Sequence, residues 1–174
     1  MKDNKFSTLV KPVVVLFAIC LVVSVLLAYT NRITAPIIAE NKKAAAEATR
    51  SAVLEGSTSF TFIPCDTEAL GIESAYREDS GLGYVITAGY KGYGGVVTVT
   101  VGLDPQGKVV GISADVSKET SGVGSKAGKE DYLAQYKGLQ GSAEGADTIS
   151  GATYSSTAVK TGVNAVLAAY DKIK

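Results

Sequence analysis

The run from Pro12 to Asn31, PVVVLFAICLVVSVLLAYTN, contains no charged residue and limits what the chain can form more than any other stretch. A helix of about 20 residues is roughly 30 Å long, which matches the hydrocarbon layer of a bilayer. Lys11 and Arg32 flank the run, and Tyr29 lies where an interfacial aromatic residue is expected. We therefore predict one transmembrane anchor at residues 12–31, after a short N-terminal tail at residues 1–11.

Two alternatives to a retained anchor fit the run less well. A buried helix of a soluble protein would need a much larger protein around it. A cleaved signal peptide would have a shorter apolar region followed by a small-x-small site, and Leu26 and Ala28 make a poor one because Leu is large. A lipoprotein signal would need a small residue before Cys20, where this chain has Ile19.

The charges beside the anchor do not decide its orientation. Basic residues lie close to both ends of the run, so the positive-inside rule gives a near tie. The residues in question are Lys2, Lys5 and Lys11 before the run, and Arg32, Lys42 and Lys43 after it.

Composition excludes several classes of function. The 174 residues carry zero formal net charge and no dense basic block, so we expect no nucleic-acid partner. Without any His, the chain has no His-based metal site and no Ser-His-Asp triad. Cys20 lies in the apolar run and Cys65 is alone in the rest, so we predict neither a disulfide nor a thiolate cluster. We therefore expect no catalytic or metal-ligating residue, and either a binding role or a borrowed cofactor.

The chain after the anchor divides into a helical linker and a domain. The linker, residues 32–56, is Ala-rich with spaced Glu, Lys and Arg, which favours a helix, and Gly56 is suited to end that helix. A solvated stalk with no other role is enough to account for this composition. Residues 57–174 form the domain, where ESAYRE, GYVITAGY, GGVVTVTVGL and KVVGISADV are strand-like. The last two are joined by DPQG, which is typical of a hairpin turn.

Two helices complete the predicted domain, a short one at about Lys129 to Tyr136 and a final one at about Ser155 to Ile173. This mixture predicts an α+β fold, in which an antiparallel sheet is packed against helices. The final helix has one apolar face at helical spacing, formed by Val159, Val163, Val166, Leu167 and Tyr170.

Three glycine-rich segments stand out within this domain: GYKGYGG at residues 89–95, ETSGVGSKA at 119–127 and DTISGAT at 147–153. None is a Walker loop or a dinucleotide fingerprint. The third segment opens the final helix, and a helix N-terminus favours an anion such as phosphate. On physical grounds alone, DTISGAT is either a phosphate site or a capping segment, and the other two are either cofactor loops or plain connections.

The segment DTISGAT resembles the Asp-x-x-(Ser/Thr)-Gly-Ala-Thr flavinylation signature of FMN-binding domains. That signature belongs to the G subunit of Rnf electron-transport complexes and to the related C subunit of sodium-translocating NADH:quinone reductases. The resemblance covers nearly the whole chain, including the GYGG stretch, the VGLDPQGKVVGI hairpin and the KETSGVGSKA loop. The family usually has Pro at Ser121 and Leu at Val123, and often Pro at Val96, but the glycines are kept.

The resemblance implies that Thr153 carries FMN through a phosphoester bond, attached by a separate flavin transferase. Asp147 would belong to the pattern that this enzyme recognises, while Ser150, Gly151 and Ala152 would surround the phosphate at the helix N-terminus. Glycines let the backbone and its N–H donors approach an aromatic plane, so we expect the other two segments to line the ring. The residues concerned are Tyr93, Gly94, Gly95, Glu119, Thr120, Gly122 and Gly124, with a solvated loop carboxylate as the alternative for Glu119.

The implied function is that of a membrane-anchored flavoprotein electron carrier. It would be one component of an ion-translocating ferredoxin:NAD oxidoreductase (Rnf) complex, with the other membrane subunits and the flavin transferase as partners. By the same resemblance, the anchor lies in the cytoplasmic (inner) membrane and the domain faces outward. The alternatives are a freestanding extracytoplasmic FMN-domain carrier of another redox chain, or an anchored, non-redox binding module in which DTISGAT is only a cap.

Overall fold

A computed structural model describes residues 5–64 and 70–173 of the chain. The chain divides into two compact units, Met1–Ala46 and Glu47–Lys174. Cys65, for which the sequence predicts no disulfide partner, lies outside the described residues.

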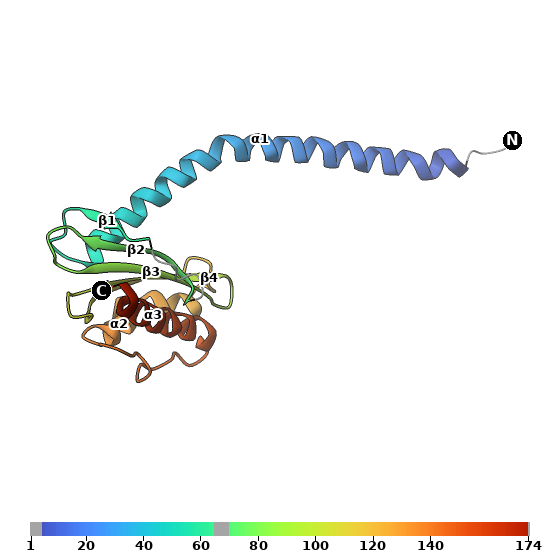
Figure 1. Cartoon of the computed structure of the whole chain (residues 1–174). Helices are drawn as coiled ribbons and strands as arrows, with labels where there is room; N and C mark the ends of the chain where they lie inside the picture. The colour runs from blue at the N-terminus through green and yellow to red at the C-terminus, as the bar shows by residue number, and fades with distance from the viewer. Residues whose placement is uncertain (1–4, 65–69, 174) are drawn as a thin grey trace. The chain divides into compact units, whose positions relative to one another are not determined.

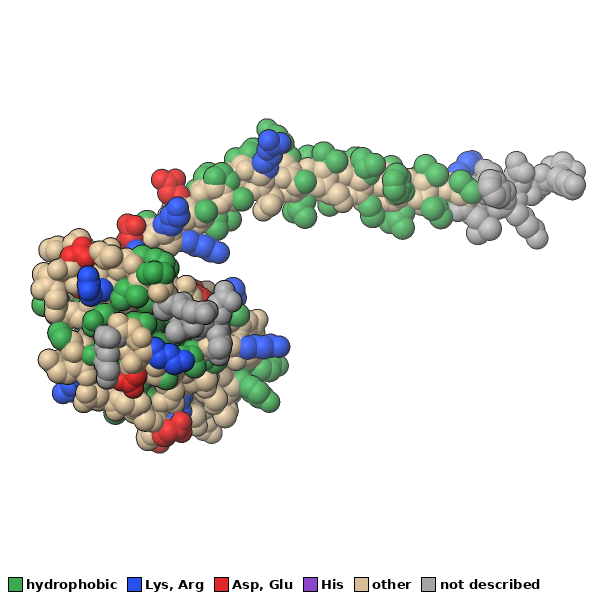
Figure 2. Space-filling model, viewed as in Figure 1, with side chains coloured by type: hydrophobic (Ala, Val, Ile, Leu, Met, Phe, Trp, Pro, Cys, Tyr) green, Lys and Arg blue, Asp and Glu red, His purple; other side chains and the backbone are tan. Residues whose placement is uncertain are grey.

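The N-terminal unit consists of the helix α1, which runs over Lys5–Val53 and continues into the second unit (Figure 1). Within the described residues, α1 is the one helix that is long and apolar enough to cross a membrane. Its large hydrophobic side chains are exposed from Val10 to Ile38, and green side chains project along this part of the helix in Figure 2. The predicted anchor, residues 12–31, and residues 32–53 of the predicted linker therefore lie in a single helix, which ends three residues before the predicted linker does.

The second unit is built on a five-stranded antiparallel sheet, in the order β1-β2-β3-β4-β5. Each strand pairs with its neighbour in sequence, so the sheet is a simple meander. The predicted α+β class is confirmed, and the short edge strand β1 is an addition that the sequence did not predict. The strands are β1 (Phe60–Phe62), β2 (Ile72–Glu78), β3 (Tyr84–Lys91), β4 (Val96–Leu103) and β5 (Val109–Asp115).

The hairpin predicted at DPQG is confirmed as the connection between β4 and β5. The Asp104 carboxylate accepts hydrogen bonds from the backbone N–H groups of Gln106 and Lys108, both at 2.9 Å. This is the local bonding that makes Asp favourable at the start of a turn.

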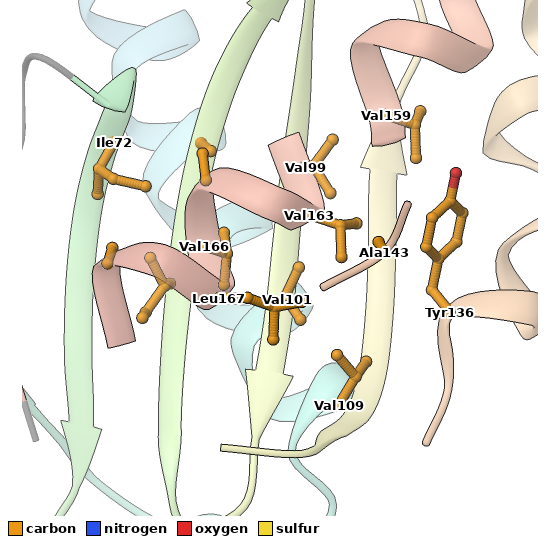
Figure 3. Packing of buried hydrophobic residues seen from close by; sticks show 14 of the residues in the cluster. Ile72, Val99, Val101, Val109, Tyr136, Ala143, Val159, Val163, Val166 and Leu167 are labelled. Carbon is orange, nitrogen blue, oxygen red and sulfur yellow. The ribbon is translucent and has the colours of Figure 1, made fainter. Parts of the chain in front are cut away.

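The helix α3, Thr153–Ile173, covers one face of the sheet. It begins two residues before the predicted start, and its predicted apolar face is confirmed, because all five residues of that face are buried. Three of them, Val159, Val163 and Val166, pack with the sheet residues Val99 and Val101 in the core drawn in Figure 3.

The opposite face of the sheet packs against the last residues of α1. Val85 clusters with Val53 and Leu54, whereas the neighbouring Ile86 belongs to the core under α3, as the alternation of side chains along a strand requires. A Cβ at Gly102 or Gly111 would overlap the carbonyl oxygen of Val53, so these paired glycines allow the close approach.

Between β5 and α3 the chain forms three short helical pieces. They are η2 (Gly124–Gly128), α2 (Glu130–Leu133) and η3 (Ala134–Tyr136). The last two lie where the sequence predicts a short helix. Tyr136 is fully buried and closes the core at this end, beside Ala143 (Figure 3).

Candidate functional site

Thr153 is the first residue of α3, and its side chain is exposed. The turn before it is tight, because the Ala152 N–H donates to the Ile149 carbonyl at 2.9 Å. Gly151 takes a φ of +80°, a left-handed conformation that L side chains adopt only with strain. The glycine of the signature is therefore needed for the backbone of this turn.

The hydroxyl that closes this segment is that of Ser156. It accepts a hydrogen bond from the Ile149 N–H at 3.1 Å and donates to the Ala152 carbonyl at 2.9 Å. Among the described residues, no hydrogen bond engages the Thr153 hydroxyl. The Ser156 hydroxyl thus caps and closes the DTISGAT segment, and the Thr153 hydroxyl is free for other chemistry.

Asp147 is held through its backbone, not its carboxylate. Its N–H donates to the Gln135 side-chain oxygen at 2.8 Å, and its carbonyl accepts from the Tyr132 hydroxyl at 2.9 Å. The side chain is exposed. The start of the signature is therefore fixed against α2 and η3, while the Asp147 side chain is exposed to solvent.

Glu119 is buried, so the alternative of a solvated loop carboxylate is wrong. Its carboxylate accepts backbone hydrogen bonds from Tyr93 at 3.2 Å, from Gly94 at 3.0 Å and from Gly95 at 3.2 Å. Its other partner is Ser155, whose hydroxyl donates a short hydrogen bond. One carboxylate therefore ties the β3–β4 loop and the loop after β5 to the first turn of α3.

The surroundings of Glu119 keep its carboxylate ionised. Burial by itself would raise the pKa, but the hydrogen bonds from the Ser155 hydroxyl and from the backbone N–H groups of Gly94, Tyr93 and Gly95 outweigh it, so the pKa lies below its ordinary value. The negative charge is satisfied by donors on the other two segments, the β3–β4 loop and the first turn of α3, which makes this contact stronger than one between neutral groups.

Glycines allow the three segments to meet around this carboxylate. A Cβ at Gly94 would overlap the carbonyl oxygen of Lys118, and one at Gly124 would lie 2.6 Å from the Ser155 hydroxyl oxygen. The N–H groups of Tyr93, Gly94 and Gly95 already donate to Glu119, so they are not free donors toward a ring.

A cavity of about 330 Å³ opens beside Thr153. Gly94, Gly95, Glu119, Gly122, Asp147 and Ser150 are not among its lining residues. A Cβ at Gly122 would meet open space. The cavity nevertheless joins predicted residues from all three glycine-rich segments: Tyr93, Thr120, Gly124, Gly151, Ala152 and Thr153.

Sequence reasoning missed further residues that line the cavity, namely Val123, Tyr154 and Ser155. Tyr154 is 73% exposed, which is unusual for a large aromatic side chain in the first turn of a helix whose other face is buried. Its position next to Thr153 is the one signal in the sequence that could have marked it.

Comparison with known proteins places the chain in a family. The sequence model described as FMN-binding domain matches residues 92–168, and the one described as RnfG N-terminal region matches residues 1–53. A relative from Acetobacterium woodii, the G subunit of a Na(+)-translocating ferredoxin:NAD(+) oxidoreductase complex, is 31% identical over 187 aligned positions, covering 91% of this chain and 90% of its own. This chain belongs to the Rnf G-subunit family.

A second relative, from Clostridium ljungdahlii, is the G subunit of a proton-translocating ferredoxin:NAD(+) oxidoreductase complex. It is 26% identical over 154 positions, covering 83% of this chain and 82% of its own length. The FMN-binding match spans every residue that lines the cavity beside Thr153. The RnfG N-terminal match ends at Val53, where α1 ends. The chain is thus a membrane-anchored Rnf G-type protein with an FMN-binding domain.

Proposed function

We propose that this protein carries electrons in an Rnf complex, and that Thr153 holds its FMN through a phosphoester bond. The position of Thr153 carries the proposal. Its exposed hydroxyl lies on the first residue of α3, at the cavity and within the flavinylation-like segment DTISGAT. The FMN-binding match supports FMN as the cofactor, and the two Rnf relatives support the complex.

The residues around Thr153 fit the phosphate of such a cofactor. The first N–H groups of α3 have no carbonyl partner one turn earlier within the helix, and its dipole favours negative charge there. A smaller cavity that Thr153 also lines includes Lys91, an exposed cation on the same side. A phosphodiester on Thr153 would keep one negative charge, which both features stabilise.

The ring would find apolar surface in the cavity beside Thr153. Tyr93 is 74% exposed and Val123 is 43% exposed, and both line this cavity. Ligand cavities in proteins start at about 300 Å³ and are mostly apolar, so a volume of about 330 Å³ suits a ring that remains partly open to solvent. Partial exposure is useful for a carrier that must pass electrons to other proteins.

FMN, when bound, supplies the transfer of one or two electrons, which the side chains of this protein do not. The protein contributes placement. Thr153 tethers the cofactor, Glu119 holds the three surrounding segments together, and α1 keeps the domain at the membrane. A tether prevents loss of the cofactor on the outer side of a membrane, where we place the domain on the basis of the family resemblance.

Covalent attachment is tested by producing the full-length protein together with a flavin transferase and measuring its intact mass and its flavin fluorescence on a denaturing gel. We expect Thr153→Ala to abolish the label, Thr153→Ser to keep part of it, and Thr148→Ala, a matched exposed hydroxyl in the same segment, to keep all of it. A labelled Thr153→Ala protein would move the site to Thr148, Ser150, Ser155 or Ser156.

The need for a transferase is tested in a host that lacks one. None of the described residues near Thr153 forms a nucleophile–base pair with its hydroxyl, so we expect a folded but colourless protein. Yellow, covalently labelled protein from such a host would show that attachment is autocatalytic.

Orientation is tested with a single exposed cysteine in the domain. Cys20→Ser and Cys65→Ser remove the native thiols, and Lys137→Cys places one at an exposed position. An impermeant thiol reagent should label this protein in intact spheroplasts. Labelling only after lysis would put the domain in the cytoplasm.

A further inference from the structure

Two cavities meet at the residue pair Thr153 and Tyr154. The larger, of about 330 Å³, extends toward Tyr93 and Val123. The smaller, of about 210 Å³, extends along α3 toward Thr157. A cofactor tethered to Thr153 could place its ring in either cavity, and Tyr154 is the neighbouring side chain that lines both.

The larger cavity carries two exposed aromatic rings. Tyr93 and Tyr154 are 74% and 73% exposed, and their ring centroids are 6.4 Å apart at an interplanar angle of 46°. Single exposed hydrophobic residues are common, but two adjacent exposed aromatics beside a cavity form a patch that usually serves binding. They come from separate segments, the β3–β4 loop and the start of α3, and both line the cavity.

The separation of these rings suits a flat aromatic guest. Carbon atoms in contact lie about 3.5–4 Å apart, so a plane that touches two rings requires them to be about 7 Å apart. The observed 6.4 Å is that of two tilted rings packed on each other, slightly closer than this, and both side chains are exposed enough to rotate apart into a parallel arrangement around a guest ring. The oxidised flavin ring is electron-poor, and it stacks well on the electron-rich face of tyrosine.

The smaller cavity is a poorer place for a ring. Its only aromatic besides Tyr154 is Tyr90, whose hydroxyl donates to the Leu70 carbonyl at 2.7 Å and whose ring packs against the core. Tyr90 is therefore fixed and cannot turn to stack. At about 210 Å³ the cavity is also below the usual size of a ligand site.

We propose that Tyr154 is a positioning residue that, with Tyr93, stacks on the flavin ring and directs it into the larger cavity. The proposal rests on the function proposed above, in which Thr153 carries FMN. Tyr154 is outside the signature itself, so it sets the surroundings of the ring without being needed for attachment.

Stacking on tyrosine has two measurable consequences. A tyrosine in contact with a flavin quenches its fluorescence, because it gives an electron to the excited ring and receives it back without emission. Its electron-rich face also stabilises the electron-poor oxidised ring more than the reduced one, so its loss should raise the midpoint potential. Neither effect requires the rest of the electron-transfer complex.

The test uses the full-length, flavin-loaded protein in detergent and measures flavin fluorescence per mole of covalent flavin, with the midpoint potential as a second readout. We expect the double variant Tyr93→Leu/Tyr154→Leu, which removes both quenching rings, to raise the fluorescence severalfold, and Tyr154→Leu alone to raise it less; both variants should raise the potential. Tyr154→Trp keeps a stacking donor and should stay quenched. Thr157→Val, which changes the smaller cavity only, is the matched control and should resemble the parent.

Tyr93→Leu tests the same stack from its other side, and it serves in place of Tyr154→Leu should the transferase fail to label that variant. Unchanged fluorescence in the labelled tyrosine variants would overturn the proposal. A change in Thr157→Val instead would place the ring in the smaller cavity and overturn it as well. If the parent protein carried no covalent flavin, the function proposed above would be overturned. This result differs from a labelled parent whose tyrosine variants are unchanged, so failure of the proposed function and failure of the stacking proposal are distinguishable.

Discussion

Glu78 and Glu119 are two buried glutamates that accept backbone hydrogen bonds from loops at opposite ends of β3. Glu78 binds the turn between β2 and β3, through the Ser80 N–H at 2.8 Å, the Ser80 hydroxyl at 2.6 Å and the Leu82 N–H at 3.1 Å. Glu119 binds the loop between β3 and β4. In both, hydrogen bonds outweigh burial and the pKa lies below its ordinary value, with the Ser80 hydroxyl as the main cause at Glu78.

The two glutamates differ in how much of the chain they connect. The partners Ser80 and Leu82 lie two and four residues from Glu78 in a single turn, and a further backbone hydrogen bond from Thr58, in the segment before β1, also lowers the pKa of this carboxylate. The partners of Glu119 are 24 to 26 residues away in one loop and 36 residues away in α3. The same chemistry therefore stabilises mainly one turn at Glu78, whereas at Glu119 it holds together the segments that form the walls of the candidate flavin site.

The largest effect should come from removing each carboxylate. Glu119→Ala leaves three backbone N–H groups and the Ser155 hydroxyl without their acceptor, at a cost of about 3 kcal/mol in the free energy of unfolding. It should also sharply reduce flavin labelling at Thr153. Glu78→Ala should lower stability while labelling stays at the parental level.

Chemical denaturation and in-gel flavin fluorescence measure these two quantities on the same preparations. Glu119→Gln is an informative intermediate, because its remaining oxygen can still accept from the Gly94 and Gly95 N–H groups. Equal losses of labelling in Glu78→Ala and Glu119→Ala would show that the site responds to general stability, and the contrast between the two glutamates would disappear.

A smaller effect is expected from adding one methyl group near each carboxylate. At Gly124 a Cβ would lie 2.6 Å from the Ser155 hydroxyl oxygen and 2.9 Å from the Glu119 Cβ, so Gly124→Ala should cost about 2 kcal/mol and disturb the flavin absorbance spectrum. The matched control is Gly81→Ala in the Glu78 turn. There the new Cβ meets nothing within 4 Å, although the φ of +84° costs about 1 kcal/mol.

Thermal unfolding together with the visible spectrum of the loaded protein separates the two variants. A normal spectrum in Gly124→Ala would mean that the Glu119–Ser155 contact can shift without moving the cavity wall.

The sequence predicted the elements whose signals are local. The uncharged run of α1, the DPQG hairpin and the buried face of α3 each follow from residues that are close together along the chain. The short strand β1 was missed because three residues give no readable period. Its place in the sheet comes from pairing with β2, which is a tertiary contact.

The candidate site was predictable only in part, for the same reason. Resemblance to a signature makes Thr153 the candidate attachment residue, but no pattern within the Glu119 loop shows that its carboxylate turns inward toward Tyr93 and Ser155. Those contacts exist because the sheet brings the ends of separate strands together. The aromatic pair of Tyr93 and Tyr154 is likewise a product of the fold, since its members are 61 positions apart in the sequence, from 93 to 154.

The stability of the domain should depend on pH through these glutamates. The folded state holds Glu119 ionised to lower pH than the unfolded chain does. Its contribution is therefore complete above the ordinary glutamate pKa of about 4.3 and is lost as the pH falls through the lower, folded value. We expect the stability difference between the parent and Glu119→Gln to shrink on acidification.

Denaturation midpoints of both proteins, from neutral pH to values below that pKa, measure this difference. Glu78 and Asp79, whose pKa values are also lowered, titrate in parent and variant alike, so they cancel. A difference that stays constant with pH would mean that Glu119 is protonated, or unimportant, in the folded protein.

The smallest effect is expected at Gly122, for which the sequence and the structure give different predictions about contact with the flavin ring. Its place in the ETSGVGSKA loop predicts contact with the ring, so that Gly122→Val would crowd the flavin. In the structure a Cβ at this position meets nothing within 4 Å, and Gly122 is not a lining residue of the cavity. Its φ of +77° leaves only backbone strain, of about 1 kcal/mol.

We therefore expect Gly122→Val to lower the unfolding midpoint slightly while flavin labelling, absorbance and midpoint potential stay at the parental values. Gly122→Asn is the matched control, because Asn tolerates the left-handed conformation and should recover part of the stability. A shifted potential in Gly122→Val, with a normal potential in Gly122→Asn, would bring this loop against the ring. The cavity that receives the flavin would then extend past Val123, and the tyrosine pair would be one wall of a larger site.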